Sequence, residues 1–175
     1  VAESFAELQA ELNRQIDRLQ EAAKEVIASC PELSEKFELL QTVTGIGERS
    51  AIYLLGELAV LPEDMLVKHW VAHAGLDPVV EHSGKDDYGP GRISKQGNAR
   101  LRHRLYMPAM SALSNKEGPI WQFRQVLVQE RGKKPIQALV AVMRKLLHCI
   151  YGIFKHREPF DENKFYNPPN SSKSG

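Results

Sequence analysis

The segment PIQALVAVMRKLLHCIYGIFK, residues 135–155, is the most apolar stretch of the chain. It carries large apolar side chains that a helix can direct toward a core: Leu139, Val140, Val142, Met143, Leu146, Leu147, Ile150 and Ile153. We therefore predict a helix from Pro135 to about Lys155 at the centre of a helical domain, with the other segments packed around it.

The overall composition limits the classes of protein to which the chain can belong. Its 175 residues, 42% of them hydrophobic, suffice for one ordinary core or two small ones. A net charge of +1 excludes a histone-like binder, so any contact with nucleic acid must be local. No apolar run approaches the roughly 18 residues of a membrane span, and the N-terminus lacks a signal-peptide pattern. We therefore expect a cytoplasmic protein without a membrane partner.

Two pairs of residues that suggest metal or disulfide chemistry are better explained as structural. Cys30 and Cys149 are too few and too far apart for a disulfide framework or a zinc motif, and we expect two reduced thiols. His69 and His73 have the spacing of metal ligands on one helix face, but no HExxH pattern and no third ligand accompany them. We therefore predict no metal site in this chain.

The first 29 residues contain neither Gly nor Pro and predict one amphipathic helix of about eight turns. Its apolar residues recur at intervals of seven, with a second stripe beside them: Phe5, Leu12, Leu19 and Val26, then Leu8, Ile16 and Ala23. Polar or small residues weaken the coiled-coil seam, because Gln15, Ala22 and Ser29 stand where apolar residues are expected.

This N-terminal helix has two interpretations. Either residues 1–30 self-associate as a coiled coil, which we favour, or the helix lies on its own domain. Pro31 ends it, because proline disfavours the helical conformation of the residue before it. The chain also begins inside the helix, so we expect a fragment of a longer protein.

Residues 33–61 resemble the helix-hairpin-helix motif of DNA repair and recombination proteins. A short helix, about 32–41, is followed by Gly45-Ile46-Gly47 and then by a helix with an apolar face. The glycines allow close approach to a phosphate, and free N–H groups at the start of the second helix point toward it. The alternative is an ordinary glycine-capped turn in which Ile46 plugs the core. We favour the motif, which predicts contact with the DNA backbone and no base recognition.

Further helices are expected at residues 62–74, 98–114 and 118–130. Asn98 is a good N-cap for the second of these helices, and Pro108 should interrupt and kink it. No segment shows the alternating apolar pattern that predicts a β-strand. The sequence therefore predicts an all-α fold, in which a coiled-coil-like helix precedes a compact helical domain.

We place that domain at residues 31–160. A tail, residues 161–175, is expected to be disordered, because the final segment PPNSSKSG has nothing to bury.

Positive charge is concentrated in HSGKDDYGPGRISKQGNARLRHRLY, residues 82–106. A glycine-punctuated run is followed there by a predicted helix. The segment contains two acidic residues, Asp86 and Asp87, and a larger set of basic residues: Lys85, Arg92, Lys95, Arg100, Arg102 and Arg104. With the glycine hairpin and the basic turn at Lys133-Lys134, this segment gives three predicted phosphate contacts on one small domain.

Catalysis is harder to predict from these residues. Asp86 and Asp87 are adjacent and do not form a motif that binds two metal ions. Ser83 and Ser94 lie in the glycine-rich run near basic residues, but a serine hydroxyl is a poor nucleophile until its proton is taken or stabilised. Turn formation and capping therefore explain either serine better than catalysis does, as far as the residues alone are concerned.

Several motifs, in their order and spacing, resemble a known family. They are Gly45-Ile46-Gly47, AGLDP at 74–78, HSG at 82–84, GRISKQGN at 91–98 and LRHRLY at 101–106. Together they resemble the C-terminal domain of the DEDD family of bacterial insertion-sequence transposases, which is related to the Piv invertase and includes bridge-RNA-guided recombinases. The resemblance covers about residues 39–154, and the N-terminal helix matches the connecting coiled coil of that family.

The resemblance implies an enzyme whose active site needs more than this chain. Members carry an N-terminal RNase H-like domain with four acidic ligands for Mg²⁺, and a C-terminal helical domain whose serine attacks DNA. The matching serine here is Ser83, with Ser94 as runner-up.

Basic residues of the segment, Arg92, Lys95, Arg100 and Arg102, would neutralise phosphate near the scissile bond. DNA and a guide RNA are the implied partners. We expect this chain alone to bind nucleic acid without recombining it, because it lacks the acidic domain.

Two other hypotheses remain. The chain could be a non-catalytic helix-hairpin-helix adaptor that binds DNA, in which case both serines are dispensable and the hairpin glycines are essential. It could also be an oligomerisation module whose charges form only a solvated face.

Overall fold

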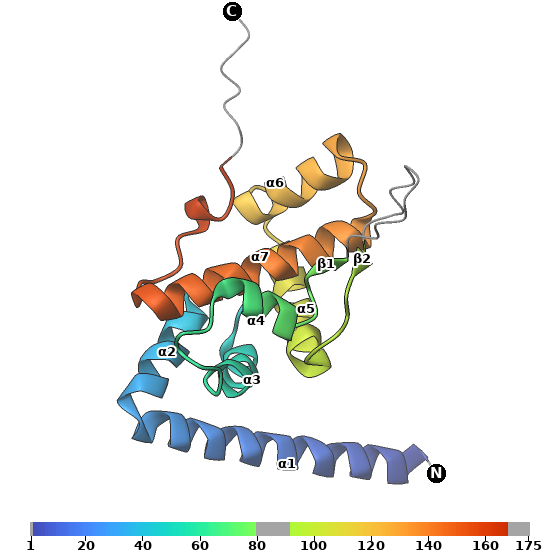
Figure 1. Cartoon of the computed structure of the whole chain (residues 1–175). Coiled ribbons are helices and arrows are strands. Elements are labelled where there is room, and N and C mark those ends of the chain that lie inside the picture. Colours follow the sequence, from blue (N-terminus) through green and yellow to red (C-terminus); the bar gives the residue numbers. More distant parts are fainter. Residues whose placement is uncertain (1, 80–91, 168–175) are drawn as a thin grey trace, which may run out of the picture.

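Helix α7 (Pro135–His156) is the axis of the domain in this computed structural model, which describes residues 2–79 and 92–167 (Figure 1). Its buried residues are Ala138, Leu139, Val142, Met143, Leu146, Leu147, Ile150 and Ile153. Helices α2 (Pro31–Gln41), α4 (Val67–His73), α5 (Ala99–Ala112) and α6 (Pro119–Gln125) pack against it. The prediction of a central helix is confirmed.

Helix α7 is also long and apolar enough to cross a membrane by length and composition. Its apolar face is instead covered by the neighbouring helices, with Leu146, Leu147 and Ile150 fully buried. It is therefore the core helix of a folded domain.

The described chain is mostly helical, which confirms the all-α fold. Helix α1 (Ala2–Ser29) leads into α2, and α3 (Glu48–Leu58) follows after a turn. A π-helical turn (Val126–Glu130) continues α6, and a 3₁₀ turn (Glu162–Lys164) follows α7.

A two-stranded sheet was not predicted. Strand β1 (Pro78–Val79) pairs antiparallel with β2 (Arg92–Ile93), so that Pro78 lies opposite Ile93. Strands of two residues are too short to show an alternating pattern in the sequence.

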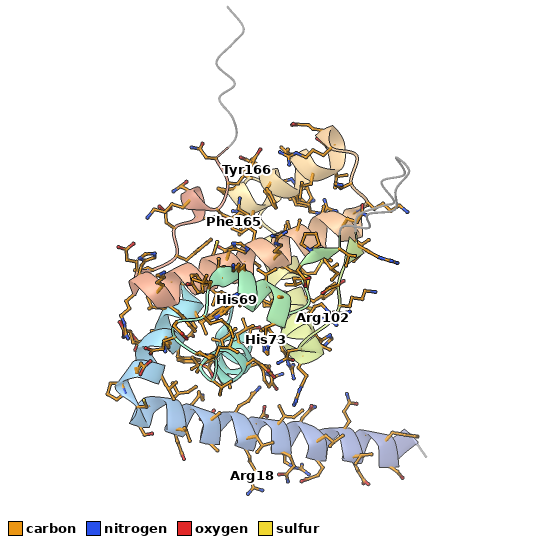
Figure 2. The ribbon with its side chains drawn as sticks, in the orientation of Figure 1. Arg18, His69, His73, Arg102, Phe165 and Tyr166 are labelled. Atoms are coloured by element: carbon orange, nitrogen blue, oxygen red, sulfur yellow. The ribbon has the colours of Figure 1, made fainter. Side chains whose placement is uncertain are left out.

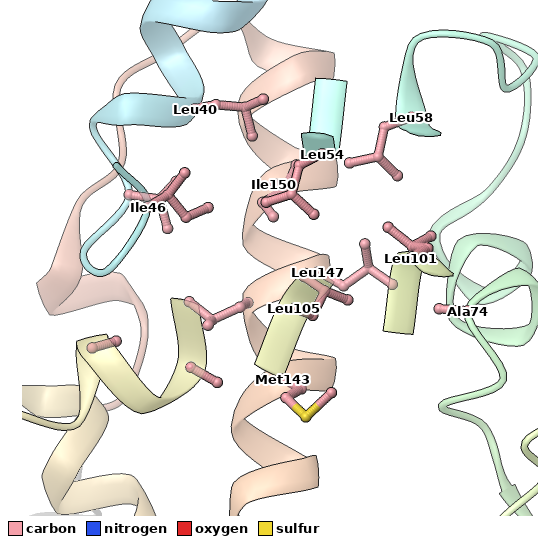
Figure 3. Packing of buried hydrophobic residues seen from close by; sticks show 14 of the residues in the cluster. Leu40, Ile46, Leu54, Leu58, Ala74, Leu101, Leu105, Met143, Leu147 and Ile150 are labelled. Atoms are coloured by element: carbon pink, nitrogen blue, oxygen red, sulfur yellow. The ribbon is translucent and has the colours of Figure 1, made fainter. Parts of the chain in front are cut away.

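The core joins residues from all the helices of the domain (Figure 3). Leu40 of α2, Leu54 of α3 and Leu101 of α5 meet Leu147 and Ile150 of α7. Packing of these aliphatic side chains removes large apolar areas from water, at about 25 cal/mol per Å². The core therefore holds α2, α3 and α5 in fixed positions around α7.

Helix α1 packs on the domain through its C-terminal half and runs along one side of it (Figure 1). Ile27 is buried at 8% exposure and the helix contacts α2 and α3. Cys30 then has an extended backbone (φ −122°, ψ 110°), so the helix ends before Pro31 as predicted. Most of the apolar seam predicted for α1 faces solvent.

Two local predictions need correction. The disordered tail was placed from residue 161, but Phe165 is 1% exposed and packs edge-to-face against Phe123 of α6 at 5.8 Å between ring centroids. The packed chain thus extends at least to Tyr166, because aromatic residues scattered among polar ones anchor it without any periodic pattern. Pro108 also does not interrupt α5, which continues from Ala99 to Ala112 with the proline buried inside it.

Candidate nucleic-acid interface

The basic segment is built on a junction between α4 and α5. The backbone of Gly75, Lys95 and Gly97 has positive φ angles of 63°, 56° and 114°. A Cβ on Gly97 would lie 2.3 Å from the carbonyl oxygen of His73, so only glycine allows this close contact. The amide of Asn98 donates to the same oxygen at 2.6 Å. The start of α5 is therefore held against the end of α4.

Asn98 caps α5, as the sequence predicted. Its Oδ1 accepts from the backbone amides of Arg100 at 2.9 Å and Leu101 at 3.0 Å. Its Nδ2 donates to Oε2 of Glu57 on α3 at 2.5 Å. The cap thus fixes the first turn of α5, and with it the position from which Arg100 projects.

Ser94 is tied to Asp77 by two bonds. Its Oγ donates to Oδ1 of Asp77 at 2.5 Å, and its backbone amide donates to the Asp77 carbonyl at 2.9 Å. Its Oγ also accepts from the amide of Gln96 at 3.3 Å. These bonds continue the β1–β2 pairing, so they join the chain before residue 80 to the chain after residue 91.

The runner-up serine therefore performs the turn-forming role that the residues alone favour. The first candidate nucleophile, Ser83, and the cation Lys85 lie outside the described residues.

Four of the predicted phosphate-binding residues divide into two pairs: the side chains of Lys95 and Arg100 are exposed to solvent, and those of Arg102 and Arg104 contact other elements of the domain. Arg102 is half-buried and donates from Nη1 to the carbonyl oxygen of Ala74 at 2.9 Å (Figure 2). Arg104 is exposed and lies 3.7 Å from the ring centroid of Tyr53, so α3 fixes its guanidinium by a cation–π contact.

Arg92 is exposed on β2. Lys133 and Lys134 are exposed in the turn before α7, where the amide of Lys134 donates to Oε1 of Gln137 at 3.0 Å. This capping interaction was not predicted, although a Gln at the third helical position is a signal for it.

The two glycines of the hairpin face different surroundings. A Cβ on Gly45 would lie 2.3 Å from the carbonyl oxygen of Pro108 and 2.7 Å from the amide nitrogen of Ala112, and its φ is +91°. Gly45 thus permits the hairpin to pack on α5. Gly47 is exposed at the N-terminus of α3, and a Cβ added to it would meet no heavy atom within 4 Å beyond its chain neighbours. Of the two, Gly47 offers the open approach that a phosphate requires.

Helix α1 contributes charges beside this end of α3. Nζ of Lys24 lies 3.0 Å from Oε1 of Glu48, and Arg49 lies 3.4 Å from Asp17. Glu21 and then Glu48 raise the pKa of Lys24. These exposed pairs contribute little to stability. They do place acidic and basic groups of α1 next to the predicted phosphate-binding turn.

Burial perturbs three titratable groups on α7. It lowers the pKa of Lys145, whose ammonium lies 4.5 Å from the ring centroid of Phe123 and 5.0 Å from that of Phe165. It also lowers the pKa of His148 and raises that of Cys149 to about 11. A thiol with so high a pKa is inert as a nucleophile near neutral pH, in agreement with a structural Cys149.

The described residues contain no group of three or more His, Cys, Asp or Glu side chains arranged to hold a metal ion. His69 is exposed and His73 is half-buried on α4 (Figure 2).

Comparison with known proteins places this site in a family. Residues 37–124, which include the hairpin, α4 and the whole α4–α5 junction, match the Transposase IS116/IS110/IS902 family. The chain belongs to this transposase family.

Two relatives are pilin gene-inverting proteins, one of Moraxella bovis and one of Moraxella lacunata. Each is 31% identical over 147 residues, which make up 84% of this chain and 45% of the relative. The chain therefore spans less than half the length of these relatives.

Sequence reasoning missed three partners that shape the site. Tyr53, Glu57 and Asp77 hold Arg104, Asn98 and Ser94, respectively. Each partner lies 17 to 51 residues away in sequence from the residue it contacts, and no local sequence pattern predicts such a contact. Only the packing of α3 and β1 against the basic segment reveals them.

Proposed function

We propose that this chain is the helical, DNA-contacting part of a recombinase that cuts and rejoins DNA during transposition or inversion. The observation that carries the proposal is the family match over residues 37–124, because it coincides with the hairpin and the basic segment. The pilin gene-inverting proteins support the same class of reaction by name.

In this proposal the basic residues hold the DNA backbone. Lys95, Arg100, Lys133 and Lys134 are exposed, and Arg104 is oriented by Tyr53. Arg92, which is exposed on β2, would add charge there, and Lys85, which lies outside the described residues, is a further proposed contact. Arg102 uses one donor for Ala74, which leaves its remaining donors for a phosphate oxygen. Such contacts give salt-dependent affinity with no sequence preference of their own.

Ser83 is the proposed nucleophile and Ser94 the runner-up. The serine oxygen attacks a phosphorus atom of the DNA, a new O–P bond forms, and the bond from phosphorus to a sugar oxygen breaks as that oxygen gains a proton. A sugar hydroxyl then attacks the same phosphorus atom, so that a sugar O–P bond forms, the serine O–P bond breaks and the serine oxygen regains a proton, which rejoins a strand. The hydrogen bond from Ser94 to Asp77 supports Ser83 as the better choice, since it gives Ser94 a role in closing the turn.

The catalytic metal belongs to another part of the protein in this proposal. Mg²⁺ bound by four acidic residues of an RNase H-like domain of the DEDD type would polarise the scissile phosphate. We expect a composite site formed by this chain and the metal-binding domain of another protomer, so that the chain alone binds DNA and does not recombine it. A guide RNA is a further proposed partner, and the protein would act in the bacterial cytoplasm.

The exposed apolar residues of α1 support a proposal that protomers assemble through this helix. Phe5, Leu12 and Leu19 are 68%, 54% and 71% exposed along one seven-residue repeat. Apolar side chains in this repeat form the seam of a coiled coil when a second helix covers them. We propose that α1 is the self-association element of the recombinase.

The test uses the complete protein and a strand-exchange assay. Ser83→Ala should abolish exchange while duplex binding stays at the wild-type level, and Ser94→Ala should reduce exchange only in proportion to any loss of folded protein. Wild-type exchange by Ser83→Ala would exclude that serine, and a selective loss in Ser94→Ala would transfer the role to Ser94.

The non-catalytic adaptor is the second candidate, and the open surface at Gly47 favours a binding role for the hairpin. It predicts that both serine variants keep full function while Gly47→Val loses duplex binding. Gly45→Val is not informative here, because its side chain would collide with α5.

A further inference from the structure

A hollow of about 450 Å³ lies on the domain away from the basic segment. Its walls come from α2, the C-terminal end of α3, the loop that follows, α4 and the end of α7. No residue of the described part of the basic segment lines it. Its volume falls in the range of sites that bind small molecules or single chemical groups.

Aromatic rings form one wall of the hollow. The ring centroids of Trp70 and Tyr151 are 5.3 Å apart, those of Trp70 and Phe154 are 6.0 Å apart, and both pairs meet edge-to-face at 85°. Tyr151 and Phe154 are half-buried, so part of each ring remains accessible. Leu58 and Met65 extend the apolar surface.

Trp70, which belongs to this aromatic cluster, also carries a polar atom that is unpaired in the described part of the chain. Its side chain is 5% exposed, and Nε1 is buried without a hydrogen-bond partner among the described residues. Buried indole N–H groups usually have an acceptor, because an unpaired donor is costly. The described residues therefore leave one indole donor of the aromatic cluster without an acceptor.

Charged groups surround the aromatic wall. Nζ of Lys155 lies 5.7 Å from the ring centroid of Tyr151, and Nζ of Lys36 lies 5.7 Å from that of Phe154. Lys36 also pairs with Glu32, and Arg157 pairs with Glu35. Lys155 has no ion pair within the described part of the chain, so no carboxylate there competes for its ammonium group beside the rings.

We propose that the hollow binds one unpaired nucleotide of a nucleic-acid strand, with the base against Tyr151 and Phe154 and its phosphate at Lys155. This inference rests on the proposed function only in taking nucleic acid as the partner. A base presents a flat π-face to the rings, and its ring edge carries both donors and acceptors for the mixed charges of the rim. An apolar protein side chain would match the wall but would leave the cation beside it without an anionic partner.

This site differs from the proposed cleavage site in what it recognises. The basic segment contacts backbone phosphates of a duplex, whereas the hollow accepts a base that is already out of a stack. Displaced DNA strands and single-stranded RNA both provide such bases.

The test measures binding of single-stranded oligonucleotides by the complete protein, with DNA and RNA of the same sequence as separate arms. Tyr151→Leu should weaken binding about tenfold to hundredfold, as expected for loss of a base–aromatic contact. Tyr151→Phe keeps the ring and should bind as the wild type does. Lys155→Gln should reduce both affinity and salt dependence, while the matched control Lys116→Gln, in an exposed turn, should change neither by as much.

An abasic oligonucleotide separates the base from the backbone. If the hollow holds a base, Tyr151→Leu has no further effect on a strand that lacks bases. Equal effects of Tyr151→Leu on the binding of normal and abasic strands would overturn the proposal, as would wild-type affinity of this variant. Displacement of the bound oligonucleotide by a peptide with an aromatic side chain, but not by a nucleotide, would also overturn it. Retained duplex binding and strand exchange in Tyr151→Leu would leave the proposed function intact, whereas failure of the wild-type protein to bind any nucleic acid would remove both proposals.

Discussion

Helices α1 and α7 are the two longest in the described chain, at 28 and 22 residues, and both are amphipathic, but they bury their apolar faces very differently. Eight residues of α7 are buried in the domain. In α1 only Ile27 is buried, among the residues whose side chains are described. An amphipathic pattern therefore predicts a helix whose apolar face packs against another element. The pattern does not say whether that element belongs to the same chain.

The difference also separates two kinds of stability. The apolar face of α7 supports the fold itself, since its removal from water is part of folding. The exposed seam of α1 gains the same kind of free energy only when another helix covers it. Substitutions in the two helices should therefore affect different equilibria.

The largest expected effect is a core truncation in α7. Leu147 is fully buried, so Leu147→Ala should lower the free energy of unfolding by about 3–5 kcal/mol, through lost burial and a new cavity. Leu12→Ala makes the same chemical change on α1, where the side chain is 54% exposed, and should change that free energy by less than about 0.5 kcal/mol. Urea denaturation of both variants measures the two values.

Similar values for the two leucines would contradict the contrast between the helices. A large effect of Leu12→Ala that disappears on dilution would instead indicate that an assembled state was being unfolded.

The next largest effect on stability is expected in the turn between α2 and α3, where Gly45 packs against α5 and Gly47 faces open space. Gly45→Ala places a Cβ 2.3 Å from the carbonyl oxygen of Pro108 at a φ of +91°, so it should cost about 2–4 kcal/mol. Gly47→Ala meets open space at an ordinary φ of −88° and should cost less than about 1 kcal/mol. Thermal denaturation of the pair gives the comparison, and equal melting temperatures would show that the hairpin is not packed on α5.

These examples show which features were predictable from the sequence. Asn98 as a helix cap and the break at Pro31 follow from local chemistry and could be predicted. The contacts of Gly45 with Pro108 and of Ser94 with Asp77 depend on segments that are distant in sequence, and folding alone brings them together. The basic composition of the segment was visible, but the structural use of Arg102 at Ala74 was not.

A pH-dependent prediction follows from Cys149 on α7. Burial raises the pKa of this thiol to about 11, whereas an unfolded thiol has a pKa of about 8.5. Between these two pH values the thiol is ionised in the unfolded chain but still protonated in the folded one. Its ionisation therefore lowers the free energy of unfolding as the pH rises from about 8.5 to 11, and has no effect at lower pH. In Cys30→Ser, alkylation of Cys149 should be slow at pH 8 and should rise about tenfold per pH unit up to pH 9.5.

Mass spectrometry of iodoacetamide-treated protein measures that rate. A plateau below pH 9.5 would mean that the thiol ionises as an exposed one does. Addition of a denaturant gives the control rate for the same cysteine in the unfolded chain.

The smallest expected change in stability, and the clearest change in assembly, lies on α1. Leu12→Ser with Leu19→Ser removes two exposed residues of the seam and should leave the unfolding free energy of a single chain within about 0.5 kcal/mol of wild type. If the seam joins two copies, the same double variant should be monomeric where the wild type is not, because polar residues at these positions remove the apolar contact between helices. Arg18→Ser with Glu25→Ser, on other faces of α1, serves as the control and should keep the wild-type state; Arg18 points away from the domain (Figure 2). Sedimentation velocity distinguishes the outcomes, and a wild-type chain that remains monomeric would show that the exposed face of α1 needs a partner other than a second copy of itself.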